Sequence, residues 1–361
     1  MAAELVIKEL CYTALASEPM AWCLRRVLLA GKSVVLMYHE IAEDDRDIEA
    51  WAVVRKSDFV EQMEYLRKHF DVVSLQEALA RRESRHSPSR PIAVVTFDDG
   101  DRGNAEVLLP IVSDLELPVS IFVATRQVVE QRNYWFDRVV NTLQTAEAVT
   151  VDLTQHGLGH FEVNRVRGAA NWGVIQGLLE RLKGLPSSVR ERVVEELVET
   201  LNGKAMRPGR IAPLDRDGVR ALAASPFVSI GAHSHCHNIL TQLDPDAVEK
   251  SVATSKQLLE SWTGKEVWSF AYPNGDYDER VAGIVRNLGF RCAITTGNRL
   301  WAASDSQYAI PRMGIGRYDS PEQFKLSLVG GLRNTLTALP WTARAASHTK
   351  ARPGETQESR V

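Results

Sequence analysis

The sequence has 361 residues, of which 44% are hydrophobic and 25% are charged, and its formal net charge is −3 at pH 7. This length and composition fit a folded protein with one large domain or two modest ones. The near-neutral charge argues against a nucleic-acid-binding protein, because such proteins concentrate Lys and Arg on one surface. The four cysteines show no C-x-x-C spacing, which disfavours a disulfide framework and fits a reducing compartment.

Residues 1–32 predict an amphipathic helical segment. Charged residues at positions 4–9 stand where an export signal would need its apolar core. Arg25 and Arg26 interrupt the best apolar run, which is far shorter than the roughly 20 residues of a membrane span. We expect this segment to pack against the rest of the chain or, as the alternative, to lie on a membrane surface. The predicted location is cytoplasmic, with contact at the inner membrane face as the peripheral option.

From residue 33 onward, short apolar runs alternate with helical patterns. The runs are "SVVLMYHE" (33–40), "PIAVVTFDDG" (91–100), "PVSIFVAT" (118–125), "PFVSIGAHSH" (226–235), "EVWSFAYPNG" (266–275), "CAITTG" (292–297) and "YAIPRMGI" (308–315). Continuous apolar runs, rather than alternating ones, are typical of parallel strands buried on both faces. The pattern predicts an α/β protein with a closed or nearly closed barrel, and a doubly wound sheet is the alternative.

Residues 129–214 interrupt this alternation. Their patterns predict a mostly helical insertion with a small hairpin at "VTVDLTQHGLGHFEV". We expect this insertion to lie over the barrel mouth, within a barrel domain that spans 33–340. Residues 341–361 lack apolar periodicity and predict a disordered tail.

Two adjacent aspartates, Asp98 and Asp99, end one of the apolar runs. Successive strand residues point to opposite faces, so both carboxylates can reach one site only if the strand turns there, which Gly100 permits. Two carboxylates so close together would repel unless a cation lay between them. The alternative is that one aspartate caps the helix beginning near Arg102 while the other is solvated.

Three histidines in five residues follow another strand, in "GAHSHCHNIL". Imidazoles at positions 233 and 237 can converge on one metal if the chain turns helically there, and with one carboxylate they leave a coordination position for water. That arrangement is typical of catalytic metal sites. The spacing leaves open whether His235 or Cys236 replaces His237, and histidines that only satisfy loop backbone groups are the alternative reading.

The motifs "TFDDG", "HSHCH" (as H-S-x-x-H) and "FAYPNG" resemble, in order, the first three motifs of the polysaccharide deacetylases. These carbohydrate esterases remove N-acetyl groups from amino sugars, and the resemblance covers roughly residues 33–318. It implies a distorted (β/α)7 barrel and a divalent metal, usually zinc. It further implies that Asp98 is the general base, that Asp99, His233 and His237 are the metal ligands, and that Ser234 supports the histidine loop.

The same resemblance implies that the backbone amide of Asn274 stabilises the oxyanion. Two departures from the family pattern stand out. Ala271 occupies the position of an arginine that orients the catalytic aspartate, and Arg312 is the candidate to replace it. The usual C-terminal catalytic histidine is missing, and His39 in "MYHEI" takes the position of the acid in a branch with permuted motifs; a packed strand-end histidine is the alternative.

The expected activity is metal-dependent hydrolysis of the N-acetyl group of an amino sugar in a polysaccharide, glycolipid or glycoconjugate intermediate. We expect Tyr272, Trp135 and Asp137 to line the substrate cleft, although aromatic packing also explains the latter region. The alternatives are a metal-dependent hydrolase of a non-sugar amide or cyclic imide, and a sugar-binding barrel without catalysis.

Overall fold

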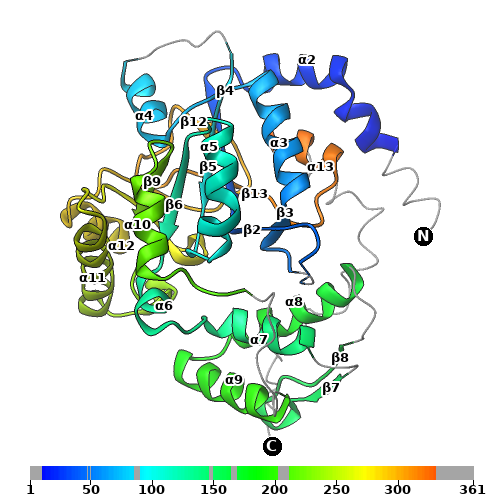
Figure 1. Ribbon diagram of the computed structural model, residues 1–361, viewed down its shortest axis with the longest axis vertical. Helices are drawn as coiled ribbons and strands as arrows, with labels where there is room; N and C mark the ends of the chain where they lie inside the picture. Colours follow the sequence, from blue (N-terminus) through cyan, green and yellow to red (C-terminus); the bar gives the residue numbers. More distant parts are fainter. Residues whose placement is uncertain are drawn as a thin grey trace, which may run out of the picture.

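The computed structural model describes residues 10–46, 48, 50–84, 90–145, 149–163, 169–201 and 211–330. The predicted tail at 341–361 lies outside the described residues. Figure 1 shows a twisted sheet surrounded by helices, with helices α7, α8 and α9 gathered at one end of it and helix α2 at the other.

Six parallel strands form the centre of the sheet, and they are adjacent in chain order. They are β1 (Lys32–Tyr38), β5 (Ile92–Phe97), β6 (Val119–Val123), β9 (Val228–Ala232), β10 (Ser269–Ala271) and β11 (Cys292–Ile294). Every residue of β5, β6, β10 and β11 is buried. This two-sided burial explains why the strands are continuous apolar runs in the sequence.

The two edges of this sheet are connected through the segment that precedes β13 (Met313–Gly314). Strand β13 pairs in parallel with β1, and Ile310 forms a parallel bridge with Ile294 at the end of β11. A doubly wound sheet would leave both edges separate. The predicted α/β class and the distorted barrel are therefore confirmed.

Short strands extend the sheet and flank it. Strand β12 (Trp301–Ala302) pairs antiparallel with the start of β1, and β4 (Asp71–Val72) pairs in parallel with β5. Strands β2 (Glu40–Ala42) and β3 (Val53–Arg55) form a separate parallel pair after the end of β1.

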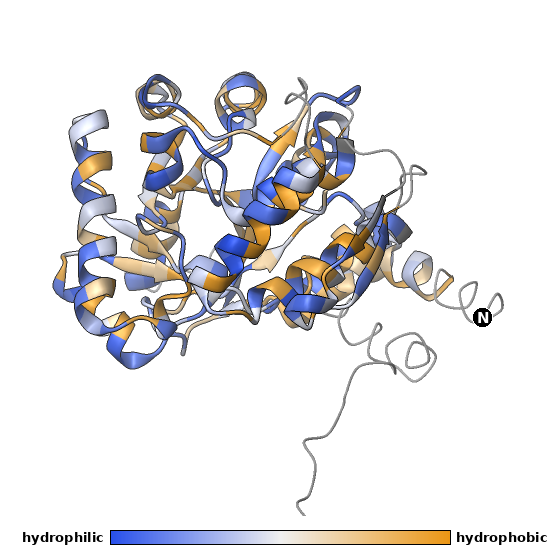
Figure 2. Cartoon of the chain, turned by 90° about the horizontal axis from the view of Figure 1, so that it is seen from below, coloured by the Kyte–Doolittle hydropathy of each residue, from blue (hydrophilic) through white to orange (hydrophobic). Residues whose placement is uncertain are grey.

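The surrounding helices bury one side against the sheet, and hydrophilic and hydrophobic residues alternate along their turns (Figure 2). They are α3 (Lys56–His69), α4 (Leu75–Glu83), α5 (Leu109–Asp114), α6 (Thr125–Glu130), α10 (Arg216–Ala224), α11 (Pro245–Thr263), α12 (Glu279–Asn287) and α13 (Pro321–Ser327). Several begin at a side chain that accepts a backbone N–H, such as Ser74, Asp244 and Asp278. Such N-caps fix where each helix starts after its strand.

The insertion contains α7 (Trp135–Thr145), β7 (Val149–Asp152), β8 (His160–Val163), α8 (Ala169–Lys183) and α9 (Ser187–Leu201). Strands β7 and β8 pair antiparallel, so the predicted hairpin is confirmed. The insertion has its own hydrophobic cluster, which includes Leu143, Leu178 and Val194, and which Ile48 and Val53 extend toward the barrel.

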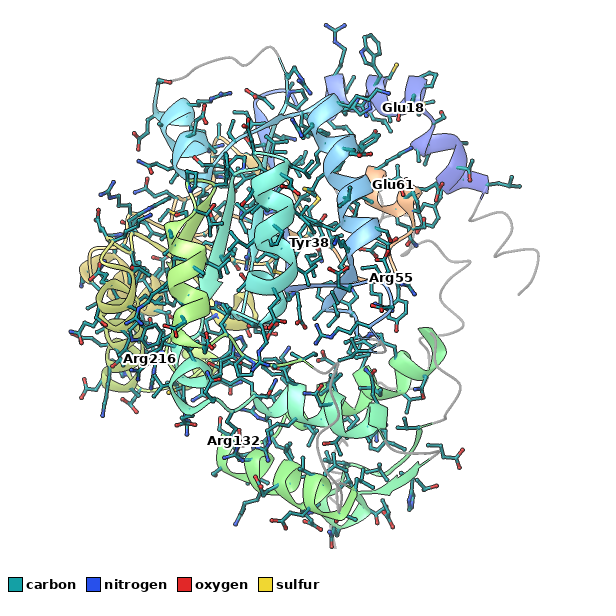
Figure 3. The ribbon with its side chains drawn as sticks, in the orientation of Figure 1. Glu18, Tyr38, Arg55, Glu61, Arg132 and Arg216 are labelled. Atoms are coloured by element: carbon teal, nitrogen blue, oxygen red, sulfur yellow. The ribbon has the colours of Figure 1, made fainter. Side chains whose placement is uncertain are left out.

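The N-terminal segment contains helical residues 10–16 and α2 (Glu18–Leu28). Tyr12 and Ala16 form a small cluster with Leu326 and Val329, against which Leu24 and Leu28 of α2 pack. Among the described residues, none of the helices combines the length and apolar character needed to cross a membrane. In Figure 3, Glu18 on α2 and Arg132, just before α7, lie at opposite ends of the molecule.

Candidate functional site

The chain turns sharply at the end of β5, and this turn places two carboxylates in one cavity. Asp98 and Asp99 are 3% and 6% exposed, and both line the cavity. Asp99 has φ +71° and Gly100 has φ +86°, so the strand geometry ends there. The next helical turn has Gly103 at its N-cap and no side-chain cap, so neither aspartate caps it and neither is solvated.

Asp98 is held by a fully buried arginine. Arg312 donates to both carboxylate oxygens, Nη1 to Oδ1 at 2.7 Å and Nη2 to Oδ2 at 2.6 Å. It also donates to Thr96 Oγ1 and to the Thr295 carbonyl. Burial raises the pKa of Asp98, but the guanidinium of Arg312 outweighs it and the pKa lies below its ordinary value. Asp98 is therefore a carboxylate at neutral pH, oriented by the residue that was expected to replace the missing arginine.

Asp99 and two histidines converge on one point. Asp99 Oδ1 lies 3.0 Å from His237 Nε2 and 3.5 Å from His233 Nε2. One ligand atom from each of the three residues lies within 4.8 Å of the other two. Burial raises the pKa of Asp99, but His237 and His233 outweigh it and hold the pKa well below the ordinary value.

The orientation of His233 is set by a backbone carbonyl. Its Nδ1 lies 2.7 Å from the Ala271 oxygen, and because a carbonyl can only accept, Nδ1 carries the proton. Nε2 therefore faces the cluster as the ligand atom. Burial lowers the pKa of His233, but Asp98 and Asp99 outweigh it and raise the pKa above its ordinary value. Arg312 balances Asp98, so Asp99 has to be neutralised by protonated histidine or by a cation.

The residues present fit a divalent metal. Ligand atoms at about 2.0–2.1 Å from a tetrahedral zinc are separated by about 3.3 Å. The separations of 3.0 and 3.5 Å from Asp99 Oδ1 to the two imidazole nitrogens bracket this value. Asp99 Oδ1 itself is buried and accepts no hydrogen bond of good geometry from the described residues. Three ligands of this kind leave one position open, as in catalytic zinc sites.

Backbone strain is concentrated at this site. The described residues include seven non-glycine residues with positive φ, and four of them are Asp99, Ser234, His237 and Asn274. Each such conformation costs of order 1–3 kcal/mol and persists where the surrounding structure holds it. The strained backbone conformations therefore coincide with the positions that the sequence motifs single out.

The histidine loop is fixed by Ser234, whose Oγ accepts the His237 N–H at 3.1 Å. His235 turns away from the cluster, and its Nδ1 lies 2.9 Å from Thr125 Oγ1. The backbone N–H groups of His235 and Cys236 approach the Ser251 hydroxyl. Of the three candidates that the spacing left open, the structure brings His237 into the cluster.

His39 follows β1 and lines the same cavity as the two aspartates. Its ring contacts Trp51 with centroids 5.5 Å apart, and its Nδ1 is buried with no hydrogen-bond partner in the described part of the chain. Burial lowers the pKa of His39, and the opposing effect of Asp99 and Asp98 does not restore it. The side chain is half-buried and available to a ligand rather than packed in the core.

The cavity has a volume of about 300 Å³ and two walls. The barrel wall is formed by the strand-end residues and Trp51. The insertion wall is formed by Trp135 and Asp137 of α7, as expected, together with Trp172 and Lys183 of α8.

Asn274 lies at the rim of the cavity, in a short turn after β10, with φ +60°. Its side chain is exposed; Oδ1 accepts a hydrogen bond from Lys183 of the insertion, and Nδ2 donates to Asp276 Oδ2 at 2.5 Å. The turn therefore joins the two walls.

The expectation that Tyr272 lines the cleft is corrected by its position. The Tyr272 hydroxyl donates to the Tyr308 carbonyl at 3.0 Å, and its ring stacks on Tyr277. Successive residues after β10 point to opposite sides. Tyr272 joins the cluster of Phe270 beneath the helices, while Ala271 joins the cluster inside the barrel.

Two further acidic side chains line the cavity: Asp137, which was expected there, and Asp101, which was not predicted from the sequence. Asp101 lies two residues after Asp99, and Asp101 and Asp137 are buried with one unpartnered oxygen each among the described residues. Burial raises the pKa of both well above the ordinary value, and Asp137 and Glu40 raise that of Asp101 further. In the sequence, Asp101 is marked only by its place in "DDGD". A polar residue in a turn explains that aspartate equally well.

Comparisons with known proteins agree with this geometry. Residues 188–293 match the family model described as polysaccharide deacetylase, a stretch that contains the histidine loop and the Asn274 turn but not the two aspartates. A search of curated proteins found no match. The resemblance to this family of carbon–nitrogen hydrolases, predicted from the motifs, is confirmed over that segment.

Solved structures share the fold at low sequence identity. The Streptococcus pyogenes deacetylase PplD, in complex with acetate, is 16% identical with a TM-score of 0.52, over 82% of this chain and 98% of that chain. IcaB from Ammonifex degensii is 16% identical with a TM-score of 0.51, over 85% and 98%. A de-N-acetylase from Aggregatibacter actinomycetemcomitans is 14% identical with a TM-score of 0.51, over 82% and 100%.

Proposed function

We propose, from the polysaccharide deacetylase match and the site geometry, that this chain is a metal-dependent deacetylase. It hydrolyses the N-acetyl group of an amino sugar in a polysaccharide, glycolipid or glycoconjugate intermediate and releases acetate. One observation carries the proposal: Asp99, His233 and His237 form a three-ligand cluster beside Asp98, a separate carboxylate that Arg312 keeps ionised.

The three ligands would hold a divalent cation, most simply Zn²⁺, which lowers the pKa of water and polarises a carbonyl when bound. Asp98 is not one of the ligands, and it accepts the proton of the water that attacks the acetamide carbon. Arg312 holds that carboxylate in one orientation, which keeps the base positioned before the substrate arrives.

His39 and Asn274 complete the reaction from the other sides of the cavity. The attack forms a carbon–oxygen bond and leaves a negative charge on the former carbonyl oxygen, toward which the Asn274 N–H donates. The carbon–nitrogen bond then breaks while His39, once it has received the proton that Asp98 took from the water, gives that proton to the departing nitrogen. Acetate and a free amine result, and Asp98 and His39 are left in the protonation states in which they began.

The cavity supports a sugar as the substrate. Its volume of about 300 Å³ lies at the lower end of the range for small-ligand sites, which suits a single sugar unit of the substrate. Trp51 and Trp135 offer apolar ring faces, and Asp101 and Asp137 offer unpartnered oxygens to hydroxyl groups.

The test is acetate release measured together with metal content across a panel of N-acetylated sugars and conjugates. We expect acetate and free amine in equal amounts, loss of both after chelation, and recovery with Zn²⁺. Chelator-resistant turnover would contradict the metal assignment. Ring opening of a cyclic imide without acetate would assign a different substrate class. Sugar binding without any hydrolysis would indicate a non-catalytic barrel. The absence of the motif arginine does not favour that alternative, because Arg312 contacts Asp98 in its place.

A further inference from the structure

Helix α2 carries apolar residues on two sides, and only one of these sides packs against the rest of the protein. Its inner side contributes Ala21 to the protein interior and packs Leu24 and Leu28 on the cluster with α13. On its outer side, Trp22 is 53% exposed and Val27 is 74% exposed. Met20 of α2 and Leu10 of the preceding helical residues 10–16 are exposed as well.

This concentration is specific to one end of the molecule. Six large hydrophobic side chains are exposed among the described residues, and four of them belong to the N-terminal segment. The other two, Val129 and Tyr277, lie on separate elements. Scattered exposed hydrophobic residues are normal, but a cluster on one helix marks an interaction surface.

A basic groove lies beside the same helix. It has a volume of about 1240 Å³ and runs along α2, α3 and α4 to the amino ends of β1 and β5. Its basic residues without an acidic partner in the described part of the chain are Arg26, Lys32, Lys68 and Arg90, while Arg82 interacts with Asp305. Of the acidic residues in the described part of the chain, Glu83 and Asp305 line it.

We propose that the outer side of α2 and this basic groove together bind the surface of an anionic phospholipid bilayer. Exposed Trp and aliphatic residues enter the boundary between headgroups and acyl chains, while Lys and Arg next to them meet the headgroup phosphates. Arg26 illustrates the combination, because its guanidinium lies 4.9 Å from the centre of the exposed Trp22 ring. A protein partner of ordinary charge would leave this excess of cations unmatched.

The proposed contact lies at the end of the barrel opposite the cavity. The groove reaches Lys32 and Ser33 at the start of β1, while His39 follows its end, and seven strand residues span about 23 Å. Figure 1 likewise shows α2 and the insertion at opposite ends of the sheet. The cavity therefore opens away from the bilayer, and this inference does not depend on the proposed deacetylase activity.

The experiment is co-sedimentation of the full chain with vesicles of phosphatidylglycerol and phosphatidylcholine, compared with phosphatidylcholine alone. We expect binding to the anionic vesicles that weakens with salt, and about tenfold or greater loss in Trp22→Ser/Val27→Ser, because two exposed apolar side chains are removed. Arg26→Glu/Lys68→Glu should lose binding to a similar extent. These residues are exposed, so the variants should fold normally.

Matched controls use the other end of the molecule. Val129→Ser removes an exposed apolar residue outside the N-terminal segment, and Lys250→Glu reverses an exposed charge on α11; both should bind vesicles as the wild type does. Equal binding by the α2 double variant and the wild type would overturn the proposal. So would a dimer in sedimentation velocity that the α2 variants dissociate without any vesicle binding, since a second copy would then cover this surface.

Discussion

The two walls of the cavity differ in how firmly the fold holds them. In the barrel wall, Asp98, Asp99 and His233 are buried at strand ends, and Arg312 fixes one of them through two hydrogen bonds. In the insertion wall, Trp135, Trp172 and Lys183 are only partly buried, and the helices that carry them pack on a hydrophobic cluster of their own. In the proposed reaction, the barrel wall supplies groups for proton transfer and metal binding, and the insertion wall supplies surface for recognition.

This difference divides the expected consequences of mutation. Substitutions in the barrel wall should lower kcat, because they remove groups that act on the reacting atoms. Substitutions in the insertion wall should mainly raise KM, because they remove contacts made equally in the ground and transition states.

The largest effect is expected for His233→Ala, which removes a ligand atom from the cluster. Bound zinc should fall to a trace, and kcat/KM should fall about 10³-fold or more, since the metal contributes several kcal/mol to the transition state. Metal analysis and acetate release measure the two effects. His235→Ala is the matched control, because that side chain faces Thr125 and should keep both metal and activity. A fully metallated, active His233→Ala would refute the ligand assignment.

Asp98→Asn should separate the base from the metal site. We expect the variant to retain zinc and to lose about 10²- to 10³-fold in kcat, within the range for a positioned proton-transfer group. Loss of metal together with activity would show that Asp98 is a ligand, and unchanged kcat would remove it from the mechanism.

His39→Ala should lower kcat about 10²-fold for an acetamide, whose nitrogen needs a proton to leave. The effect should shrink toward zero for an activated acetate ester, because its leaving group needs no proton. Parallel rates on the two substrates measure this difference. The same loss on both would assign His39 a structural role.

The smallest catalytic effect belongs to the insertion wall. Trp135→Ala should raise KM about three- to tenfold while leaving kcat within about twofold, as expected for the loss of one aromatic contact. Steady-state kinetics on an N-acetylated sugar test this, with Trp135→Phe as the variant that should recover most of the affinity. A large fall in kcat instead would place the insertion in the chemical step.

The two walls should also differ in the sign of their pH-dependent stability. The pKa of Asp98 is lowered, so its contribution is present above about pH 4 and is lost as the pH falls through the folded-state value. The pKa of Asp137 is raised well above the ordinary value, so stability falls as the pH rises from about 4 toward that value. Denaturant unfolding of the metal-free protein should therefore show a flatter decline above pH 4 in Asp137→Asn and a flatter rise below pH 4 in Asp98→Asn. An unchanged profile in either variant would contradict the corresponding assignment.

The sequence by itself determined the barrel class and most of the barrel wall. Each strand is a local apolar run, and polar residues at its end mark the edge where parallel strands meet, so Asp98, Asp99 and the histidine loop could be brought together without coordinates. The cytoplasmic location, by contrast, stays a prediction.

Only the tertiary structure decided the rest. The sequence offered Arg312 as a candidate, but it reaches Asp98 from 214 residues away, and nothing local to either residue encodes that contact. Tyr272 was misplaced because the turn after β10 decides which side of the strand returns to the cavity. Asp101 and Asp137 are polar residues in their own segments, and they become unpartnered carboxyl groups only because the insertion folds back over the barrel and removes them from water.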